Sequence, residues 1–534
     1  MPETEKKEPR MIVGVIVLML ASLLEKILGV LFKIPLNDIL GSKGMGYFNS
    51  AYSIFSTFYT VSLTGFPIAV SIMISKSRAN GRIIEVNKIY RAALCVFIAL
   101  GLIGSSIMFF GADSIANFID GDNNSPLCIK AIAPILLIIC VSGSIKGFFQ
   151  GHNNMMPTAI SEFLDALGKC ALGVVLGVYA AQKGYSIEVC AAYAIAGVTI
   201  GHLLGMTFLV LLKIIKKPEY TGEISDESLR YGKIVKTLFW IAVPITLSSV
   251  ALGLMANIDT FTIMNVLKSE NGMEMYGDYT TLVVTLFRLP QAFILPISAA
   301  LTPTLASSIS SNNELRAKST MSSSIRLASG VAMPCTLGLA TLAYPIIYLL
   351  FGNDKTASSV KENAPYLSIL AIGVFFMAIL TVTSSILQAH KLQKMPVIAA
   401  FCGMATKLVL NIVLMKLFGM IGAPISSVIG YFVMAVLNLV FVKKYVYKDL
   451  KIIKPVGKSL AASVIMAAFA LGVYKALEFM TKSVKISVIV AVLLAIVFYF
   501  VVNLIIKGIE KEDIMLLPHG EKIYGFLHKI KLMK

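Results

Sequence analysis

The sequence predicts an all-α polytopic membrane protein with about 14 transmembrane helices, built as two six-helix lobes in a parallel repeat plus two C-terminal helices. Composition is the first reason: of 534 residues, 57% are hydrophobic and only 14% are charged, against about 25% charged in an ordinary soluble protein. The mean hydropathy is +0.81. The second reason is the number of long apolar stretches, and the third is the alternation of cationic segments between them. A soluble enzyme could not bury this much apolar surface in one core.

Fourteen stretches are long enough to cross a bilayer, which takes about 20 mostly apolar residues. They cover residues 11–34, 47–75, 89–111, 126–149, 157–182, 187–212, 237–267, 279–308, 320–350, 364–388, 395–418, 421–442, 459–477 and 484–506. The first stretch follows a charged decapeptide, and no small-residue cleavage site comes after it. We therefore expect a retained helix and not a signal peptide.

The positions of lysine and arginine predict the orientation. If the N-terminus is cytoplasmic and the stretches alternate, 32 of the 47 Lys and Arg residues fall in inner segments, ten in outer segments and five within spans. Cytoplasmic loops carry such an excess of cations. We therefore expect both termini in the cytoplasm, and we attribute the net charge of +18 to membrane topology and not to nucleic-acid binding.

An internal repeat predicts the two lobes. The pattern Gln150-Gly-His152 followed by Lys169 returns as Gln388-Ala-His390 followed by Lys407, with 19 residues from Gln to Lys in both. An offset of six helices gives a parallel repeat, as in many two-lobed transporters. The predicted parts are an N-terminal lobe (1–212), a cytoplasmic linker (213–236), a C-terminal lobe (237–442), a two-helix appendix (443–506) and a basic cytoplasmic tail (507–534).

Nine ionisable residues fall within the spans, where each ionised group costs at least ~2.5–3.5 kcal/mol unless it faces a cavity or a partner. Glu162, Asp165 and Lys169 are spaced i, i+3 and i+7 on one helix face, so an Asp165–Lys169 ion pair is expected, either as structural glue or as a functional site. Arg288 falls in mid-helix without an acidic neighbour within a turn, which favours a cavity role. The nine are Glu25, Lys26, Lys33, Glu162, Asp165, Lys169, Asp259, Arg288 and Lys407.

Two of these residues have an alternative explanation. Lys33 lies near the outer end of its helix and either snorkels to the interface or lines a cavity. Asp259 is either a helix-end group facing the outside or a functional group. The seven cysteines have no C-x-x-C spacing and no nucleotide-binding loop is present, so we expect no catalytic residue, no metal site and no cofactor.

Three segments resemble the stage V sporulation protein B family, which belongs to the polysaccharide biosynthesis branch of the multidrug/oligosaccharidyl-lipid/polysaccharide (MOP) exporter superfamily, beside the MurJ-type lipid II flippases. They are residues 21–76, residues 285–306 and the segment from Gln150 to Pro157. The resemblance covers essentially the whole chain. It implies a bacterial plasma-membrane flippase that moves an undecaprenyl-diphosphate-linked cell-wall precursor, lipid II or a related polysaccharide lipid, from the inner to the outer leaflet.

The resemblance also implies an alternating-access cycle driven by an ion gradient or the membrane potential, with Na+ or H+ as candidate coupling ion and cell-wall synthesis proteins as candidate partners. MurJ-type flippases carry an arginine cluster in helices 1, 2 and 8, whereas this sequence offers Lys26 and Lys33 in the first stretch and Arg288 in the eighth. We expect these three residues to bind substrate. The expected coupling or gating residues are Glu25, Glu162, Asp165, Lys169, Asp259 and Lys407.

Three other functions compete with a flippase. A cation-coupled multidrug exporter of the same superfamily would have an acidic or aromatic pocket, whereas the spans here hold five cations and four acids. A non-transporting sporulation scaffold in the membrane is the second. A membrane enzyme is the third, but it would need acid, base or metal residues on a sizeable extramembrane loop.

Overall fold

A computed structural model describes residues 8–63, 65–119, 126–152, 154–215, 229–267, 271–310, 313–353, 356–447, 453–506 and 508. Every regular element in these ranges is a helix, which confirms the predicted all-α class. Nine stretches within them are long and apolar enough to cross a membrane, or ten if one bent pair of helices is included, and three of the nine contain more than one helix. The expected number of fourteen stays a prediction.

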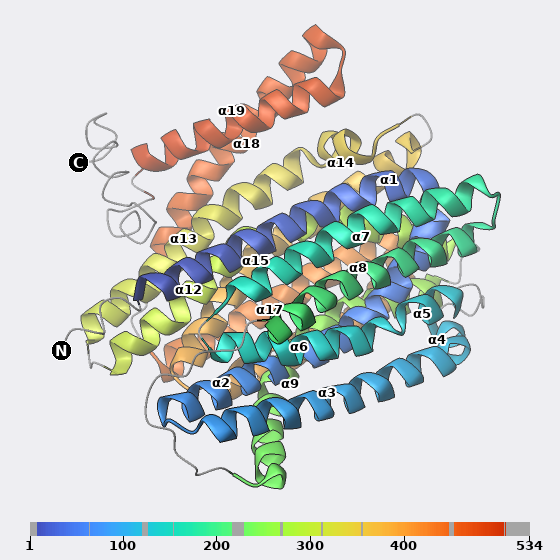
Figure 1. Cartoon of the computed structure of the whole chain (residues 1–534). Helices are drawn as coiled ribbons and strands as arrows, with labels where there is room; N and C mark the ends of the chain where they lie inside the picture. The colour runs from blue at the N-terminus through green and yellow to red at the C-terminus, as the bar shows by residue number, and fades with distance from the viewer. Residues whose placement is uncertain are drawn as a thin grey trace. The chain divides into compact units, whose positions relative to one another are not determined.

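The chain divides into two units, residues 1–277 (unit 1) and 278–534 (unit 2). In unit 1, α7 packs against α8 and α1, and α6 packs against α2, α3 and α8 (Figure 1). The helices of unit 1 are α1 Glu8–Leu63, α2 Gly65–Ala79, α3 Ile83–Phe110, α4 Ala112–Ile119, α5 Pro126–Ile132, α6 Ile135–Gly151, α7 Met156–Gln182, α8 Ile187–Ile215, α9 Tyr231–Leu267 and α10 Gly272–Asp278.

The first helix, α1, is two helices joined at Gly41. Gly41 has φ 63° and ψ −178°, a left-handed conformation that glycine adopts without steric cost. The rings of Phe32 and Phe48 are 5.8 Å apart, although residues 16 apart in a straight helix would be separated by about 24 Å. The two segments therefore pack on each other, as the predicted spans 11–34 and 47–75 require.

Several predicted spans are interrupted. The span 47–75 changes from α1 to α2 around residue 64, and the span 126–149 breaks between α5 and α6 at Pro134. The span 320–350 consists of α13 and α14, which meet at 81°. Proline removes a backbone donor and kinks helices, and this explains the break at Pro134.

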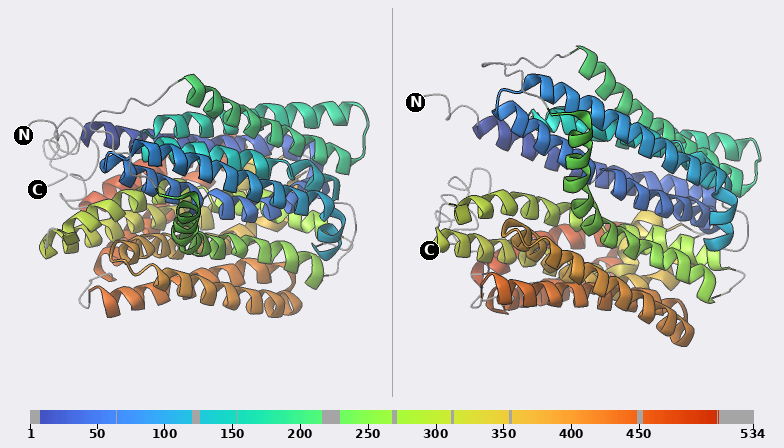
Figure 2. Two further views of the ribbon diagram at one scale, coloured as in Figure 1. Left: turned by 60° about the horizontal axis from the view of Figure 1, so that its bottom comes forward. Right: turned by 90° about the horizontal axis from the view of Figure 1, so that it is seen from below.

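In unit 2, α15 packs against α13 and α17, α16 packs against α17, and α18 packs against α19 and α13 (Figure 2). Its elements are a π-helix η1 Tyr279–Val284, α11 Thr285–Phe287, α12 Gln291–Ser310, α13 Glu314–Thr341, α14 Ala343–Phe351, α15 Ala357–Ala389, α16 Lys394–Phe418, a 3-10 helix η2 Gly419–Ile421, α17 Gly422–Tyr445, α18 Ile453–Thr481 and α19 Val484–Ile505.

The predicted domain boundaries stay predictions. Helix α9, expected as the first helix of the C-terminal lobe, packs against α1, α2 and α3 within unit 1. Residues 216–228 of the expected linker and 509–534 of the expected tail lie outside the described residues. The expected appendix forms a hairpin, α18–α19, whose apolar core around Met466, Tyr474 and Tyr499 also includes Leu342 between α13 and α14.

Candidate functional site

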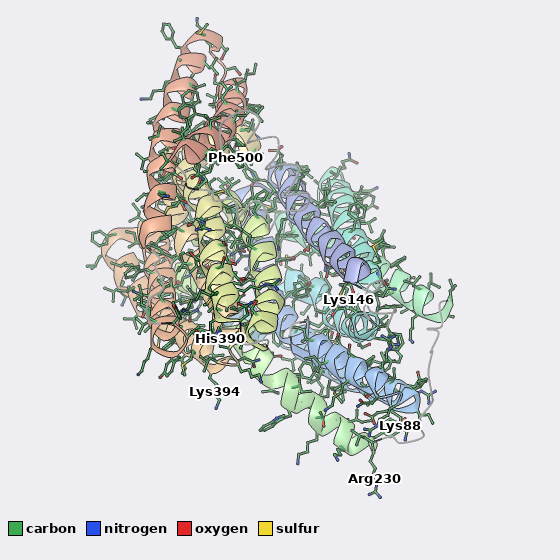
Figure 3. The ribbon with its side chains drawn as sticks, turned by 90° about the vertical axis from the view of Figure 1, so that its left-hand side faces the viewer. Lys88, Lys146, Arg230, His390, Lys394 and Phe500 are labelled. Carbon is green, nitrogen blue, oxygen red and sulfur yellow. The ribbon has the colours of Figure 1, made fainter. Side chains whose placement is uncertain are left out.

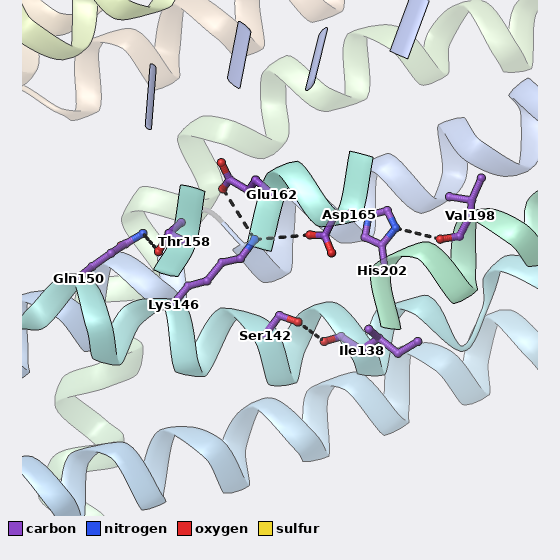
Figure 4. A network of polar contacts seen from close by, with 9 residues as sticks. All are labelled: Ile138, Ser142, Lys146, Gln150, Thr158, Glu162, Asp165, Val198 and His202. Atoms are coloured by element: carbon purple, nitrogen blue, oxygen red, sulfur yellow. Dashed lines mark hydrogen bonds and ion pairs between the residues drawn. The ribbon is translucent and has the colours of Figure 1, made fainter. Parts of the chain in front are cut away.

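Three charged side chains of unit 1 meet between α6 and α7, and we call them the α6–α7 cluster: Lys146, Glu162 and Asp165 (Figure 4). Lys146 Nζ lies 3.7 Å from Glu162 Oε1 and 3.8 Å from Asp165 Oδ2. The exposed fractions of the three side chains are 7%, 24% and 17%. These three groups alone carry a formal charge of −1, which Lys26 and Lys169 partly offset from outside the cluster. Either carboxylate can still take up a proton or a small cation.

The turn between α6 and α7 positions the cluster. The His152 backbone N–H donates to Phe149 O at 3.0 Å, and its ring Nδ1 lies 2.8 Å from Phe148 O. Helix α7 then begins with a proline in its first turn, where a missing N–H costs nothing. Because Glu162 and Asp165 are three residues apart on α7, they point to one side, and that side faces Lys146.

A glycine on the neighbouring helix makes room for Asp165. A Cβ atom at Gly205 of α8 would overlap Asp165 Oδ1, so a larger residue there would displace the carboxylate. Asp165 Oδ1 is buried and has no hydrogen-bond partner within the described part of the chain. A buried polar atom without a partner carries a desolvation cost of about 1–3 kcal/mol. This oxygen is therefore the atom of the cluster where a proton or cation would be stabilised most.

The prediction of an Asp165–Lys169 ion pair is wrong, because the ion-pair partner of Asp165 is Lys146 on the neighbouring helix α6. Lys169, one turn further along α7, is half-buried and interacts electrostatically with Glu25 of α1 as well as with Asp165. Cys170 Sγ donates to a backbone carbonyl of α1 at 3.1 Å, which fixes α7 against α1 at this level. The i,i+4 spacing permitted the local pair, but tertiary packing supplied a closer partner.

Two residues of this region, Lys146 and His202, were not among the site residues predicted from the sequence. Lys146 falls within the predicted span 126–149, but so near its end that it was assigned to the inner segment. His202 lies on α8, where its Nδ1 is 3.0 Å from Val198 O and where Lys146 and Lys169 act on it electrostatically. The signal was present for both, since each is a polar residue inside an apolar stretch.

The two predicted substrate-binding lysines of α1 lie on its first segment. Lys33 is half-buried, and its Nζ donates to Asn49 Oδ1 at 3.0 Å, across the break at Gly41. This contact binds it to the protein, which argues against simple snorkelling. Lys26 is exposed and interacts electrostatically with Glu162.

The predicted mid-helix position of Arg288 is wrong. The span 279–308 starts with the π-helix η1, and Arg288 caps the short α11 at a turn that ends where α12 begins. Its backbone N–H donates to Val284 O at 3.1 Å. The side chain is exposed and makes no hydrogen bond or ion pair with any described residue. A guanidinium at a break between helices is well placed to accept a ligand, as in transporters built with discontinuous helices.

The two remaining predicted residues, Asp259 and Lys407, belong to other helices. Asp259 is buried on α9, next to Thr260, whose hydroxyl is 2.8 Å from Tyr276 Oη. Lys407 is buried on α16 of unit 2. Within the described ranges, no group of three or more His, Cys, Asp or Glu side chains could hold a metal ion.

The structure thus gathers one part of the predicted site. Glu25, Lys26, Glu162, Asp165 and Lys169 belong to one electrostatically coupled region of unit 1. Arg288 and Lys407 belong to unit 2. A joint substrate site of Lys26, Lys33 and Arg288 therefore stays a prediction.

The chain matches two protein-family models. The model of the polysaccharide biosynthesis protein family matches residues 12–309, and the MatE model matches residues 244–413. Among curated relatives, the chain is 26% identical over 465 residues to the lipid II flippase MurJ of Bacillus subtilis (strain 168), covering 82% of this chain and 84% of the relative. It is 24% identical over 514 residues to the stage V sporulation protein B of the same organism, covering 95% and 97%.

Solved structures share the fold. A multidrug resistance MATE family transporter of the MOP superfamily, in an inward-facing conformation, superposes with a TM-score of 0.67 at 15% identity, covering 80% of this chain and 97% of the transporter. The lipid II flippase MurJ in an inward closed conformation gives a TM-score of 0.61 at 17% identity, covering 92% and 98%. With the family model matching more than half of its residues, the chain is a multi-span membrane protein that belongs to the polysaccharide biosynthesis protein family and has the fold of MOP superfamily transporters.

Proposed function

We propose that the protein is an alternating-access flippase of the bacterial plasma membrane that moves an undecaprenyl-diphosphate-linked cell-wall precursor from the inner to the outer leaflet. The observation that carries the proposal is the placement of charge: lysines and carboxylates sit within the apolar helices α1, α6 and α7, where they cost free energy unless they serve a ligand or each other. The likeness to flippases supports the substrate class.

The chemical task is to carry a diphosphate and its sugars through hydrocarbon. Lys26 and Lys33 of α1 and Arg288 supply cations for the diphosphate, and an arginine binds phosphate oxygens through two parallel N–H groups whereas a lysine acts as a point charge. Exposure of the Arg288 side chain at a turn leaves it available to a ligand. Both termini are cytoplasmic in this proposal.

The α6–α7 cluster supplies the coupling step. Binding of H+ or Na+ at Asp165 Oδ1 neutralises one of the two carboxylates that hold Lys146, and this weakens the ion pair that joins α6 to α7. A ligand shifts a conformational equilibrium only by its differential affinity for the two states. In the proposed cycle, Lys146 is paired with Asp165 in one conformational state and released from it in the other. This difference gives the coupling ion a different affinity for the two states.

A multidrug exporter is the second candidate. The match of the MatE model to residues 244–413 and the higher TM-score of the MATE transporter favour it. An organic cation would be repelled by Lys26, Lys33 and Arg288, so the two functions predict opposite responses to charge reversal at these positions.

The test is charge reversal at Arg288. In proteoliposomes, the fraction of labelled lipid II accessible from the outside is measured over time, and Arg288→Glu is expected to lower the rate at least about ten-fold by turning an attraction for the diphosphate into a repulsion. Lys394→Glu, at an exposed position that begins α16, is the matched control and is expected to transport normally.

Three outcomes separate the candidate functions. Unchanged lipid II movement by Arg288→Glu would contradict the assigned role of that residue. Export of organic cations that increases in Arg288→Glu would favour the multidrug exporter. Wild-type protein that moves neither substrate under an imposed ion gradient would support the scaffold.

A further inference from the structure

The first half of α9 packs across other helices of unit 1. Figure 2 shows α9 in two differently directed halves, and Figure 1 shows the first half crossing α2 and α3 steeply. Its inner face is an apolar row of Ile234, Leu238 and Ala242, which are 0%, 1% and 0% exposed and join the core formed by α2, α3, α6 and α8. Residues four apart share one face of a helix, so the opposite face points away from the core of unit 1.

That opposite face exposes Trp240, which is 82% exposed and is the only tryptophan of the chain. Tyr231, three residues before Ile234 and so on the side of the apolar row, is 47% exposed at the beginning of the helix. Tryptophan and tyrosine gather at the boundary between headgroups and acyl chains, where one end of the ring is apolar and the other polar. A helix that crosses its neighbours steeply and exposes such residues has the character of an interfacial helix.

Three cations accompany the aromatic residues. Arg230, Lys233 and Lys236 are exposed, and their side chains make no hydrogen bond or ion pair with any residue in the described ranges. Lys88 of α3 adds a fourth positive charge, with its Nζ 5.9 Å from the centre of the Tyr231 ring. Figure 3 shows Lys88 and Arg230 at the same end of unit 1.

A nearby carboxylate positions this surface without neutralising it. Glu85 is buried, and its Oε1 accepts a hydrogen bond from Ser77 Oγ at 2.8 Å. Its Oε2 accepts from the backbone N–H of Leu229 at 3.2 Å. Glu85 therefore fixes the residue that immediately precedes Arg230, so the cations are presented by an anchored backbone.

We propose that this surface, the α9 patch, binds the anionic headgroup of a bilayer phospholipid. The patch consists of Arg230, Tyr231, Lys233, Lys236 and Trp240. The cations contact the phosphate and any further negative charge of the headgroup, while the Trp240 ring lies at the level where the acyl chains begin. This binding is independent of the transported substrate, because it concerns the surrounding membrane.

The single tryptophan makes the proposal directly measurable. The purified full chain is reconstituted in phosphatidylcholine vesicles that contain a fixed mole fraction of lipid with brominated acyl chains, either phosphatidylglycerol or phosphatidylcholine. Bromine quenches Trp240 fluorescence only at close contact. We expect an apparent affinity for brominated phosphatidylglycerol at least about five-fold above that for brominated phosphatidylcholine, which reflects the attraction of one or more cations to an anionic surface.

The variant Arg230→Gln/Lys233→Gln/Lys236→Gln is expected to lose this preference, and the corresponding Lys/Arg exchange variant is expected to keep it. Neutralising three exposed cations of unit 2, Lys361→Gln/Lys391→Gln/Lys394→Gln, is the matched control and should leave the preference unchanged. Equal quenching by both brominated lipids would overturn the proposal, as would absence of quenching by either.

Two further outcomes distinguish other anions from a phospholipid. A preference that is abolished by excess undecaprenyl diphosphate would assign the patch to the transported lipid. A preference that is absent in the wild type and appears only when Glu219, Glu223, Asp226 and Glu227 of the preceding segment are changed to Gln or Asn would assign the patch to that segment. Either result would refute the proposed phospholipid site.

Discussion

The helix pair α6–α7 of unit 1 and the pair α15–α16 of unit 2 have similar turns, but they differ in the side chains at corresponding positions within the helices. In both, the histidine that caps the first helix places Nδ1 close to a carbonyl four residues earlier, 2.8 Å for His152 and 2.9 Å for His390. Counted from the glutamine two residues before each histidine, Lys146 corresponds to Ser384 and Asp165 to Gly403. The common sequence pattern therefore specifies the turn, and the three charges of the α6–α7 cluster occur in the first copy only.

In the second pair the corresponding residues are small, and both contact α17. Ser384 accepts a hydrogen bond from Asn438 at 2.9 Å, and a Cβ atom at Gly403 would lie 2.8 Å from Gly430 O. Small residues allow membrane helices to approach closely. Unit 1 thus has an ionic contact where unit 2 has backbone packing, and this difference assigns the proposed coupling chemistry to unit 1.

Removing Lys146 is expected to have the largest effect on this comparison. In Lys146→Met, two partly buried carboxylates lose their cation, and breaking such a pair costs about 3–5 kcal/mol. The loss is measured as a lowered melting temperature by circular dichroism in detergent. Ser384→Ala at the corresponding position of unit 2 removes one hydrogen bond and is expected to cost about 0.5–1.5 kcal/mol.

A triple variant tests the physical reason. Lys146→Met/Glu162→Gln/Asp165→Asn removes all three charges and is expected to recover most of the lost stability, because no unpaired ion remains. If Lys146→Met unfolds at the same temperature as Ser384→Ala, the ionic contact does not distinguish the units energetically.

Gly205 offers a smaller effect at the same site. Gly205→Ala places a methyl group on Asp165 Oδ1, and such overpacking costs about 1–3 kcal/mol. Gly472→Ala on α18 has nothing within 4 Å of the added atom, so it is expected to stabilise its helix by about 0.5–1 kcal/mol. Thermal unfolding compares the two, and a neutral Gly205→Ala would mean that Asp165 can move aside freely.

Close to neutral pH, the smallest expected effect is the pH dependence due to His152, at the turn that the two units share. Burial lowers the pKa of His152 to about 4, with Arg78 and Lys213 adding to the shift and the Phe148 carbonyl opposing it. The unfolded chain takes up this proton near pH 6.5, whereas the folded chain does not until about pH 4. Stability is therefore full above about pH 6.5 and declines as the pH falls towards 4.

The change is measured as melting temperature against pH for the wild type and His152→Gln. The variant should lose the part of the decline between pH 6.5 and 4 that belongs to this histidine. Superimposable pH profiles would contradict the assigned burial effect.

Much of the fold followed from the sequence, because hydropathy over about 20 residues reports burial in a bilayer directly. The separate helices either side of Gly41 and the common face of Glu162 and Asp165 follow from local periodicity alone. The π-helix before Arg288 and the Lys146 contacts did not follow. Both features depend on which neighbouring helices pack against the segment. An ion pair between two helices cannot be predicted from the residue spacing within one of them.

The α6–α7 cluster has a consequence for biosynthesis. A single helix that leaves the translocon with an ionised lysine, aspartate or glutamate side chain has an unfavourable free energy of insertion into lipid. Helices α6 and α7 are separated by only a few residues, Gly151 to Met156, so they can enter the bilayer as a hairpin in which Lys146 already faces its two acids. The ion pairs would then favour the joint insertion of the two helices during translation.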